Sequence, residues 1–325
     1  MKLSRERLQA EAQATGFRAE ILEKVFHLLG LLRGFKSHPF LKERLALKGG
    51  TALNLFQFDL PRLSVDIDVN YVGAAERETM LKERPKVEQA VRDVCSREGM
   101  SVTRQPGDGE FAGGKWRLRY DSAMGEGGNL EVDLNFMFRV PLWPVLRRDS
   151  RQVGPFSAKQ IPVVDLHELA AGKMAALLSR QAGRDLFDVH QLLTQGTLDR
   201  GKLRLGFVLL GAMNRKDWRT VSQSDVGVSA QELQNHLLPL MRSDSLDRLG
   251  DVGVWTRRLV DECRGHLSAV LPFTDNEKAF LNRLLDHGEI AAPLLTQDSE
   301  MAVRINRHPL LQWKALNVQK YKRKR

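Results

Sequence analysis

Long apolar segments and closely spaced cysteines are missing from this sequence. No stretch approaches the run of about 18 apolar residues that crosses a bilayer, so we expect no membrane span. The N-terminal residues alternate charged and apolar side chains and lack the apolar core of a secretory signal, which predicts a cytoplasmic protein. The two cysteines, Cys95 and Cys263, lie far apart in the sequence, which predicts neither a disulfide framework nor a zinc knuckle.

Two familiar catalytic motifs are also absent. No Gly-x-x-x-x-Gly-Lys-Ser/Thr loop occurs, which argues against a P-loop ATPase. The segment His167-Glu168-Leu169-Ala170-Ala171 begins like the helix of a zinc protease, but alanine stands where the second histidine ligand is required. The chemistry of this protein must therefore come from other residues.

The net charge of +10 is concentrated at the C-terminal end. Residues 302–325 contain eight Lys or Arg residues and no acidic residue, whereas the rest of the chain has nearly equal numbers of both. A basic segment on a nearly neutral body favours contact with a phosphate backbone, and a solvated terminus is the alternative. The candidate RNA-binding residues in this segment are Lys320, Lys322, Arg323, Lys324 and Arg325.

The chain length and the periodicity of its apolar residues predict an α+β protein. At 325 residues there is room for two domains. Strand signals largely stop after Pro141, so we expect a mixed sheet with flanking helices followed by an all-helical domain. The predicted parts are N-terminal helices in 1–44 that pack on the next part, a strand-rich domain in 45–150, and a helical domain with the basic tail in 151–325. We expect strands at 45–48, 65–72, 130–138 and 161–164, and helices at 51–58, 77–99, 165–180, 184–193, 201–213, 230–242, 255–270 and 276–287.

Acidic residues alternate with apolar ones in two of these strands. Asp66 and Asp68 are two residues apart, so they lie on one face of their strand, where their repulsion favours a bound cation. Hard carboxylate oxygens suit Mg²⁺ or Mn²⁺, and Asp133 on the second alternating strand is our candidate for a third metal ligand. The alternative for any Asp-x-Asp pattern is an exposed edge strand with solvated acids.

A pair of glycines precedes this acidic strand. The apolar segment before Gly49-Gly50-Thr51 predicts a strand that ends in glycine and leads into a helix. Bare backbone N–H groups at such a position can bind phosphate, although glycine pairs also form ordinary turns.

One lysine falls on an apolar helix face. Lys173 lies in the stripe formed by Leu166, Leu169 and Leu177, so it points inward and needs an anionic partner. Two partners are possible, a nucleotide phosphate or an internal acid such as Asp188.

Taken together and in order, four segments resemble the AbiEii/AbiGii toxin family. They are Lys48-Gly49-Gly50-Thr51-Ala52-Leu53, Arg62-Leu63-Ser64-Val65-Asp66-Ile67-Asp68, Lys173, and Arg184-Asp185-Leu186-Phe187-Asp188. The family comprises nucleotidyltransferase-like toxins of abortive-infection and type IV toxin-antitoxin systems, including the MenT-type toxins. The resemblance implies a polymerase-β-like nucleotidyltransferase domain in 45–150 and a cognate antitoxin as a partner.

The resemblance also implies roles for these residues. Catalysis would depend on Asp66, Asp68, Lys173 and Asp188, with metal at Asp66, Asp68 and our own addition Asp133. The nucleotide would be bound by Lys48, Gly49, Gly50, Thr51, Ser64 and Lys173. An acceptor hydroxyl would attack the α-phosphate of a nucleoside triphosphate, and for MenT-type relatives that hydroxyl is the 3′ end of tRNA. The alternatives are a nucleotidyltransferase that modifies a protein or small molecule, and a non-catalytic nucleic-acid-binding module.

Overall fold

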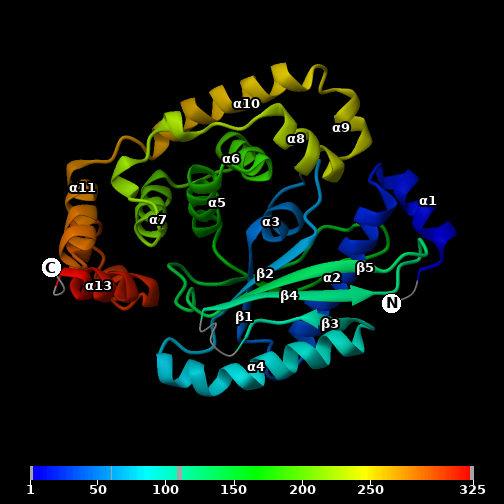
Figure 1. Cartoon of the computed structure of the whole chain (residues 1–325), viewed down its shortest axis with the longest axis horizontal. Coiled ribbons are helices and arrows are strands. Elements are labelled where there is room, and N and C mark those ends of the chain that lie inside the picture. The colour runs from blue at the N-terminus through cyan, green and yellow to red at the C-terminus, as the bar shows by residue number, and fades with distance from the viewer. Residues whose placement is uncertain (1–2, 60, 108–111, 323–325) are drawn as a thin grey trace. The chain divides into compact units, whose positions relative to one another are not determined.

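The computed structural model describes residues 3–59, 61–107 and 112–322 (Figure 1). The chain divides into two compact units. The first, here called the sheet unit, comprises Met1–Arg139, Val145–Val164 and Leu237–Gly250. The second, the helical unit, comprises Val140–Pro144, Asp165–His236 and Asp251–Arg325. The α+β prediction of a mixed sheet with flanking helices and a helical region is confirmed, and the three-part domain division stays a prediction.

A seven-stranded mixed sheet organises the sheet unit. Its strands are β1 (Leu45–Lys48), β2 (Asp66–Tyr71), β3 (Ser101–Arg104), β4 (Gly113–Tyr120), β5 (Gly128–Asn135), β6 (Leu146–Arg148) and β7 (Ile161–Val163). They lie in the order β3-β4-β5-β2-β1-β7-β6. The pairs β2/β5 and β1/β7 are parallel, and the other neighbours are antiparallel.

Helix α2 lies on the apolar face of this sheet, and further helices complete the sheet unit. The helical segments of the sheet unit are α1 (Arg5–Thr15), α2 (Ala19–Ser37), α3 (Gly49–Ala52) with its π-helical continuation η1 (Leu53–Gln57), α4 (Arg77–Arg97), η4 (Leu238–Leu240) and α9 (Ser243–Asp247). Helix α2 contacts β5, β7 and α4, and α4, in cyan in Figure 1, runs along the sheet beside it. Because side chains alternate along a strand, burying Leu47, Val69 and Val132 against helices turns the charged residues of the same strands to the opposite face.

The helical unit contains the remaining helices. They are α5 (Leu166–Arg180), α6 (Gly183–Gln195), α7 (Arg200–Ala212), α8 (Ala230–His236), α10 (Val252–His266), α11 (Asp275–Asn282), α12 (Ser299–Asn306) and α13 (Pro309–Lys322), with the short segments η2 (Trp218–Thr220), η3 (Gln223–Asp225), η5 (Leu267–Ala269), η6 (Arg283–His287) and η7 (Ala292–Leu294). Aromatic rings of Phe207, Trp218 and Phe273 pack together in its core. Within the described ranges, no helix is both long and apolar enough to cross a membrane.

Two predicted elements end earlier than their apolar patterns do. Strand β5 stops at Asn135 because the Asn135 side chain accepts hydrogen bonds from the backbone N–H groups of Met137 and Phe138, which turns the chain. The helix predicted over 230–242 ends at His236, and Pro239, which lacks a backbone N–H, lies in the first turn of the short helix η4.

A buried histidine of α2 makes the stability of the sheet unit depend on pH. The ring of His27 packs on Tyr120 with centroids 4.0 Å apart. Burial lowers the pKa of His27 to about 4, which outweighs the opposing charge of Glu23. Since the unfolded chain binds the proton more tightly, this stabilisation is present above the unfolded pKa of about 6.5 and is lost as the pH falls toward 4.

We therefore expect the melting temperature to fall between pH 7 and pH 5, and to fall less in His27→Phe, which keeps an aromatic ring against Tyr120. The difference between the two proteins should reach at least about 2 °C. Melting curves recorded across this pH range check the expectation. Equal pH dependence in both proteins would show that His27 titrates normally in the folded state.

Candidate active site

Charged residues on four neighbouring strands form one row across the sheet. The strand registers pair Lys48 of β1 with Asp68 of β2, Asp68 with Asp133 of β5, and Asp133 with Lys115 of β4. Directly paired residues on adjacent strands share a face and lie close enough to interact. Two aspartates thus lie side by side with a lysine at each end, and we name this arrangement the central charged row.

The burial of Asp133 and the charges around it affect its proton affinity. Burial raises the pKa of the Asp133 carboxyl and is the largest contribution, and the neighbouring charge of Asp68 raises this pKa further. Lys48 and Lys115 act in the opposite direction. A carboxylate in this position favours an additional cation, because the two lysines do not cancel the cost of burial and of repulsion by Asp68.

Asp66 belongs to the row next to the central charged row, and the charged residues of this second row are different. Its partner across the parallel pair is Glu131, which lies opposite Arg117. Glu131 forms ion pairs with Lys115 at 2.8 Å and with Arg117 at 3.1 Å. The hydrogen bond from Lys115 is the main cause that lowers the pKa of Glu131. Glu131 is therefore already neutralised by protein cations.

The glycine segment lies directly against this acidic face. Gly49 begins α3 with φ +72°, and a Cβ added there would be 2.1 Å from Asp68 Oδ2. The Thr51 hydroxyl donates to the backbone carbonyl of Asp66 at 2.5 Å. A Cβ on Gly50 would be 2.9 Å from the hydroxyl of buried Ser64. The residues predicted to bind the nucleotide from this part of the chain are thus brought together beside Asp66 and Asp68. They are Lys48, Gly49, Gly50, Thr51 and Ser64, and their nucleotide-binding role stays a prediction.

The close approach of Gly49 to Asp68 gives a specific expectation for Gly49→Ala. The new methyl group would displace the Asp68 carboxylate, so nucleotidyl transfer should fall by about 100-fold or more. Gly250→Ala is the matched control, because Gly250 has φ +68° but no atom within 4 Å of the added Cβ. Both variants carry the same backbone strain of about 1–2 kcal/mol. Initial rates measured on both proteins check the expectation, and equal activities would contradict it.

The carboxylates of this face fit a divalent cation in their donor chemistry. Among the residues that the structure describes, no three His, Cys, Asp or Glu side chains form a ready-made metal cluster. Mg²⁺ is commonly held by only one or two carboxylates, and takes the rest of its ligands from substrate phosphates and water. Asp66 and Asp68 satisfy that requirement. Asp133, beside Asp68, stays a predicted third ligand.

In the helical unit, Lys173 of α5 lies between two aspartates of α6. Its Nζ is 3.0 Å from Asp185 Oδ1 and 2.8 Å from Asp188 Oδ2, and the two carboxylates are 1% and 0% exposed. Burial alone would raise the pKa of Asp185, but Lys173 and a 2.6 Å hydrogen bond from Arg180 outweigh it and lower that pKa. Lys173 therefore forms the internal ion pair that was one of its two possible interactions. The active-site roles of Lys173 and Asp188 stay predictions.

The other sequence candidates lie in the basic C-terminal segment. Lys320 is exposed on α13, whose last residue is Lys322. Arg323, Lys324 and Arg325 lie outside the described residues. One residue that the sequence did not single out is Lys115, whose position in the central charged row depends on strand order. Its alternation with Trp116 and Leu118 could have shown that it faces the polar side of its strand, but not which residues it faces.

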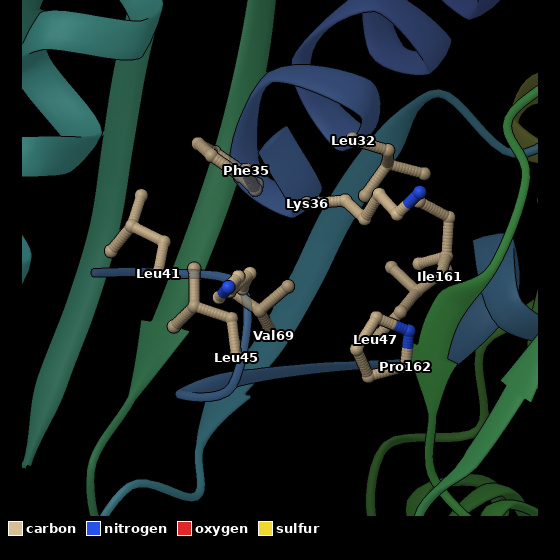
Figure 2. A pocket seen from close by; sticks show the side chains of 10 residues that line it. Leu32, Phe35, Lys36, Leu41, Leu45, Leu47, Val69, Ile161 and Pro162 are labelled. Carbon is tan, nitrogen blue, oxygen red and sulfur yellow. The ribbon is translucent and has the colours of Figure 1, made fainter. Parts of the chain in front are cut away.

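A small cavity in the sheet unit lies on the apolar side and carries no comparable chemistry. Figure 2 shows its lining between α2 and the strands, including Leu32, Leu47, Val69 and Ile161. Its volume of about 20 Å³ leaves room for little more than one water molecule. Leu47 and Val69 alternate with Lys48 and Asp68, so the cavity and the charged row are on opposite faces of the sheet.

Known proteins resemble this chain in sequence and in fold. The sequence profile of the nucleotidyltransferase AbiEii toxins of type IV toxin-antitoxin systems matches residues 30–252. The fold is similar to that of MenT4, a nucleotidyltransferase toxin from Mycobacterium tuberculosis H37Rv, with a TM-score of 0.58, 20% identity, and 96% of this chain and 99% of that chain covered. A comparison with curated protein sequences found no match. The chain belongs to the AbiEii family of nucleotidyltransferase toxins of type IV toxin-antitoxin systems.

Proposed function

We propose that this toxin transfers a nucleoside monophosphate from a nucleoside triphosphate to the 3′ end of tRNA in the cytoplasm, and thereby blocks translation. In this reaction the acceptor hydroxyl oxygen forms a bond to the α-phosphorus while the bond from that phosphorus to the bridging oxygen breaks. Pyrophosphate leaves, and the hydroxyl proton passes to a base or to water.

The observation that carries this proposal is the central charged row. Asp68 and Asp133 are paired on adjacent strands. Asp66 lies in the neighbouring row on the same face of the sheet, and the glycine segment lies against this face. Asp66 and Asp68 would hold Mg²⁺ or Mn²⁺, which when bound neutralises charge on the phosphates and on the attacking oxygen. Lys48 and Lys115 lie at the ends of the row, where their positive charge attracts the triphosphate.

Such a transfer requires positioning and charge neutralisation more than covalent participation by the protein. Gly49 and Gly50 lack side chains, so the Asp68 carboxylate and the Ser64 hydroxyl can lie directly against this backbone. Thr51 fixes the start of β2 through its bond to the Asp66 carbonyl. The pairing of β2 with β5 keeps Asp66, Asp68 and Asp133 on one face of the sheet.

An RNA acceptor is favoured by the basic segment 302–325, since eight cationic residues without an acid suit a phosphate backbone. The alternative is transfer to a protein or a small molecule, for which no feature of the described residues argues specifically. The type IV assignment implies a cognate antitoxin, and our proposal does not require that it bind the toxin directly.

Labelled nucleotides test the reaction. Each of the four nucleoside triphosphates, labelled at the α- or the γ-phosphate, is incubated with the toxin, total RNA and Mg²⁺, and the RNA, protein and metabolite fractions are separated. We expect α-label in the tRNA fraction, no transfer of γ-label, and loss of transfer when EDTA removes the metal. Label found only in protein or metabolites would exclude tRNA as the acceptor.

A further inference from the structure

Exposed hydrophobic side chains gather near the C-terminal end of the described chain. Six large hydrophobic residues are exposed among the residues that the structure describes, and four of them belong to α12 and α13. They are Val303, Trp313, Leu316 and Tyr321, with exposed fractions of 50%, 54%, 53% and 66%. Exposed aromatic residues that cluster in this way mark an interaction surface more often than isolated ones do.

Helix α13 is anchored by contacts with other parts of the helical unit. Leu311 and Ala315 are buried, Lys314 Nζ donates to the Asn214 carbonyl at 2.8 Å, and Gln319 Nε2 donates to the Gly288 carbonyl at 2.8 Å. Helix α13, in red in Figure 1, packs against η6, the segment that continues α11. These contacts hold α13 in place, and its exposed side chains therefore belong to an anchored helix.

The outward stripe has regular helical spacing and mixed chemistry. Trp313, Leu316 and Lys320 are at positions i, i+3 and i+7, so they lie on one face of the helix. Tyr321, at i+8, lies about 80° around the helix from Trp313. At 1.5 Å per residue, Trp313 and Tyr321 are separated by about 12 Å along the helix axis. Lys320 lies between the two aromatic rings in this direction.

We propose that this stripe, Trp313-Leu316-Lys320-Tyr321, is a stacking platform for single-stranded RNA. Successive bases stack on aromatic side chains while basic residues contact the backbone, which is the usual chemistry of single-strand binding. Charge complementarity favours RNA as the occupant, because residues 302–325 contain no acidic residue that would repel phosphate. The proposal rests on RNA being the acceptor, and it assigns binding to residues beyond 30–252, the range that the family profile matches.

The tryptophans of this protein make the platform measurable. Of the five tryptophans, Trp116, Trp143, Trp218 and Trp255 are buried and Trp313 is exposed. Titration with oligouridine, an RNA without base-paired structure, should quench the fluorescence of Trp313 as a base stacks on it. In Trp313→Phe the quenching should disappear while binding, followed by the anisotropy of fluorescein-labelled oligouridine, stays within about threefold of the wild-type Kd.

Removing the rings of Trp313 and Tyr321 tests how much they contribute to the affinity for RNA. Trp313→Ala with Tyr321→Ala should raise the Kd for labelled oligouridine by about 10-fold or more, given the strength of base-aromatic stacking. The control is Leu146→Ala with Val254→Ala, which removes exposed hydrophobic side chains elsewhere and should leave the Kd unchanged. All four proteins carry Asp66→Asn and no triphosphate is present, so that binding is measured without transfer.

The outcomes separate this inference from the proposed reaction. If the double alanine variant binds oligouridine as tightly as its parent, the platform is refuted, even when the active enzyme transfers nucleotides to RNA. If the variant instead loses self-association or antitoxin binding with an unchanged Kd for RNA, the surface is a protein interface and our inference is again wrong. If oligouridine binding weakens as expected but α-label never enters RNA, the platform stands and the proposed acceptor fails.

Discussion

Replacing Asp66 with asparagine should abolish nucleotidyl transfer and cellular toxicity while leaving the fold intact. The substitution keeps the size of the side chain but removes the negative charge that would hold the divalent cation. We expect the rate to fall by at least about 10³-fold, which corresponds to about 4 kcal/mol of lost transition-state stabilisation. Initial rates with α-labelled nucleotide, and growth of cells that express each variant, measure the effect.

Glu131→Gln is the matched control for Asp66→Asn. Glu131 lies beside Asp66 on the same face, but its carboxylate is already paired with Lys115 and Arg117. We expect the rate of nucleotidyl transfer by Glu131→Gln to fall by less than about 10-fold. The fold should be kept as well, because exposed or half-exposed ion pairs contribute little to stability. An Asp66→Asn protein that is folded and still toxic would favour the non-catalytic module instead.

Replacing Lys173 with alanine should produce the largest loss of stability among these variants. The substitution leaves the buried carboxylates of Asp185 and Asp188 without their shared cation. Breaking a buried pair by removing one partner typically costs about 3–5 kcal/mol. Denaturant unfolding of the wild type and of Lys173→Ala checks this value, and equal unfolding midpoints would contradict a stabilising role for the pair.

A compensated variant separates stability from catalysis at this position. Lys173→Met combined with Asp185→Asn and Asp188→Asn removes all three charges at nearly constant volume, so much of the lost stability should return. If transfer returns as well, the network is structural only. If stability returns while transfer stays absent, the result supports the roles that family resemblance assigned to Lys173 and Asp188.

The sequence predicted the acidic strands well because alternation is a local signal. The pattern from 65 to 72 became β2, and the apolar segment before Gly49 became β1 with the boundaries expected for it, 45–48. The charged helix predicted over 77–99 is α4, Arg77–Arg97. What alternation cannot give is the order of strands, so the pairing of Asp68 with Asp133 and of Asp133 with Lys115 became known only from the fold.

Other features had no clear local signal. Strand β6 is three residues long and its sequence, Leu146-Arg147-Arg148, is exposed throughout, so it shows no buried face to recognise. Helix α13 was missed because Trp313 and Leu316 place apolar side chains on its exposed side, which weakens the contrast between its faces. From the inward position of Lys173, the sequence indicated either a nucleotide phosphate or an internal acid as its partner. Only the geometry showed the ion pairs with Asp185 and Asp188.

The most direct test of nucleotidyl transfer to tRNA is mass spectrometry of RNA 3′ ends. Total RNA is incubated with unlabelled nucleoside triphosphates, Mg²⁺ and either the wild-type toxin or Asp66→Asn, and the 3′-terminal fragments are weighed. We predict that tRNA 3′ ends gain the mass of one or more nucleoside monophosphate residues with the wild type only. Unchanged tRNA 3′ ends with a wild-type preparation that is toxic in cells would contradict the account.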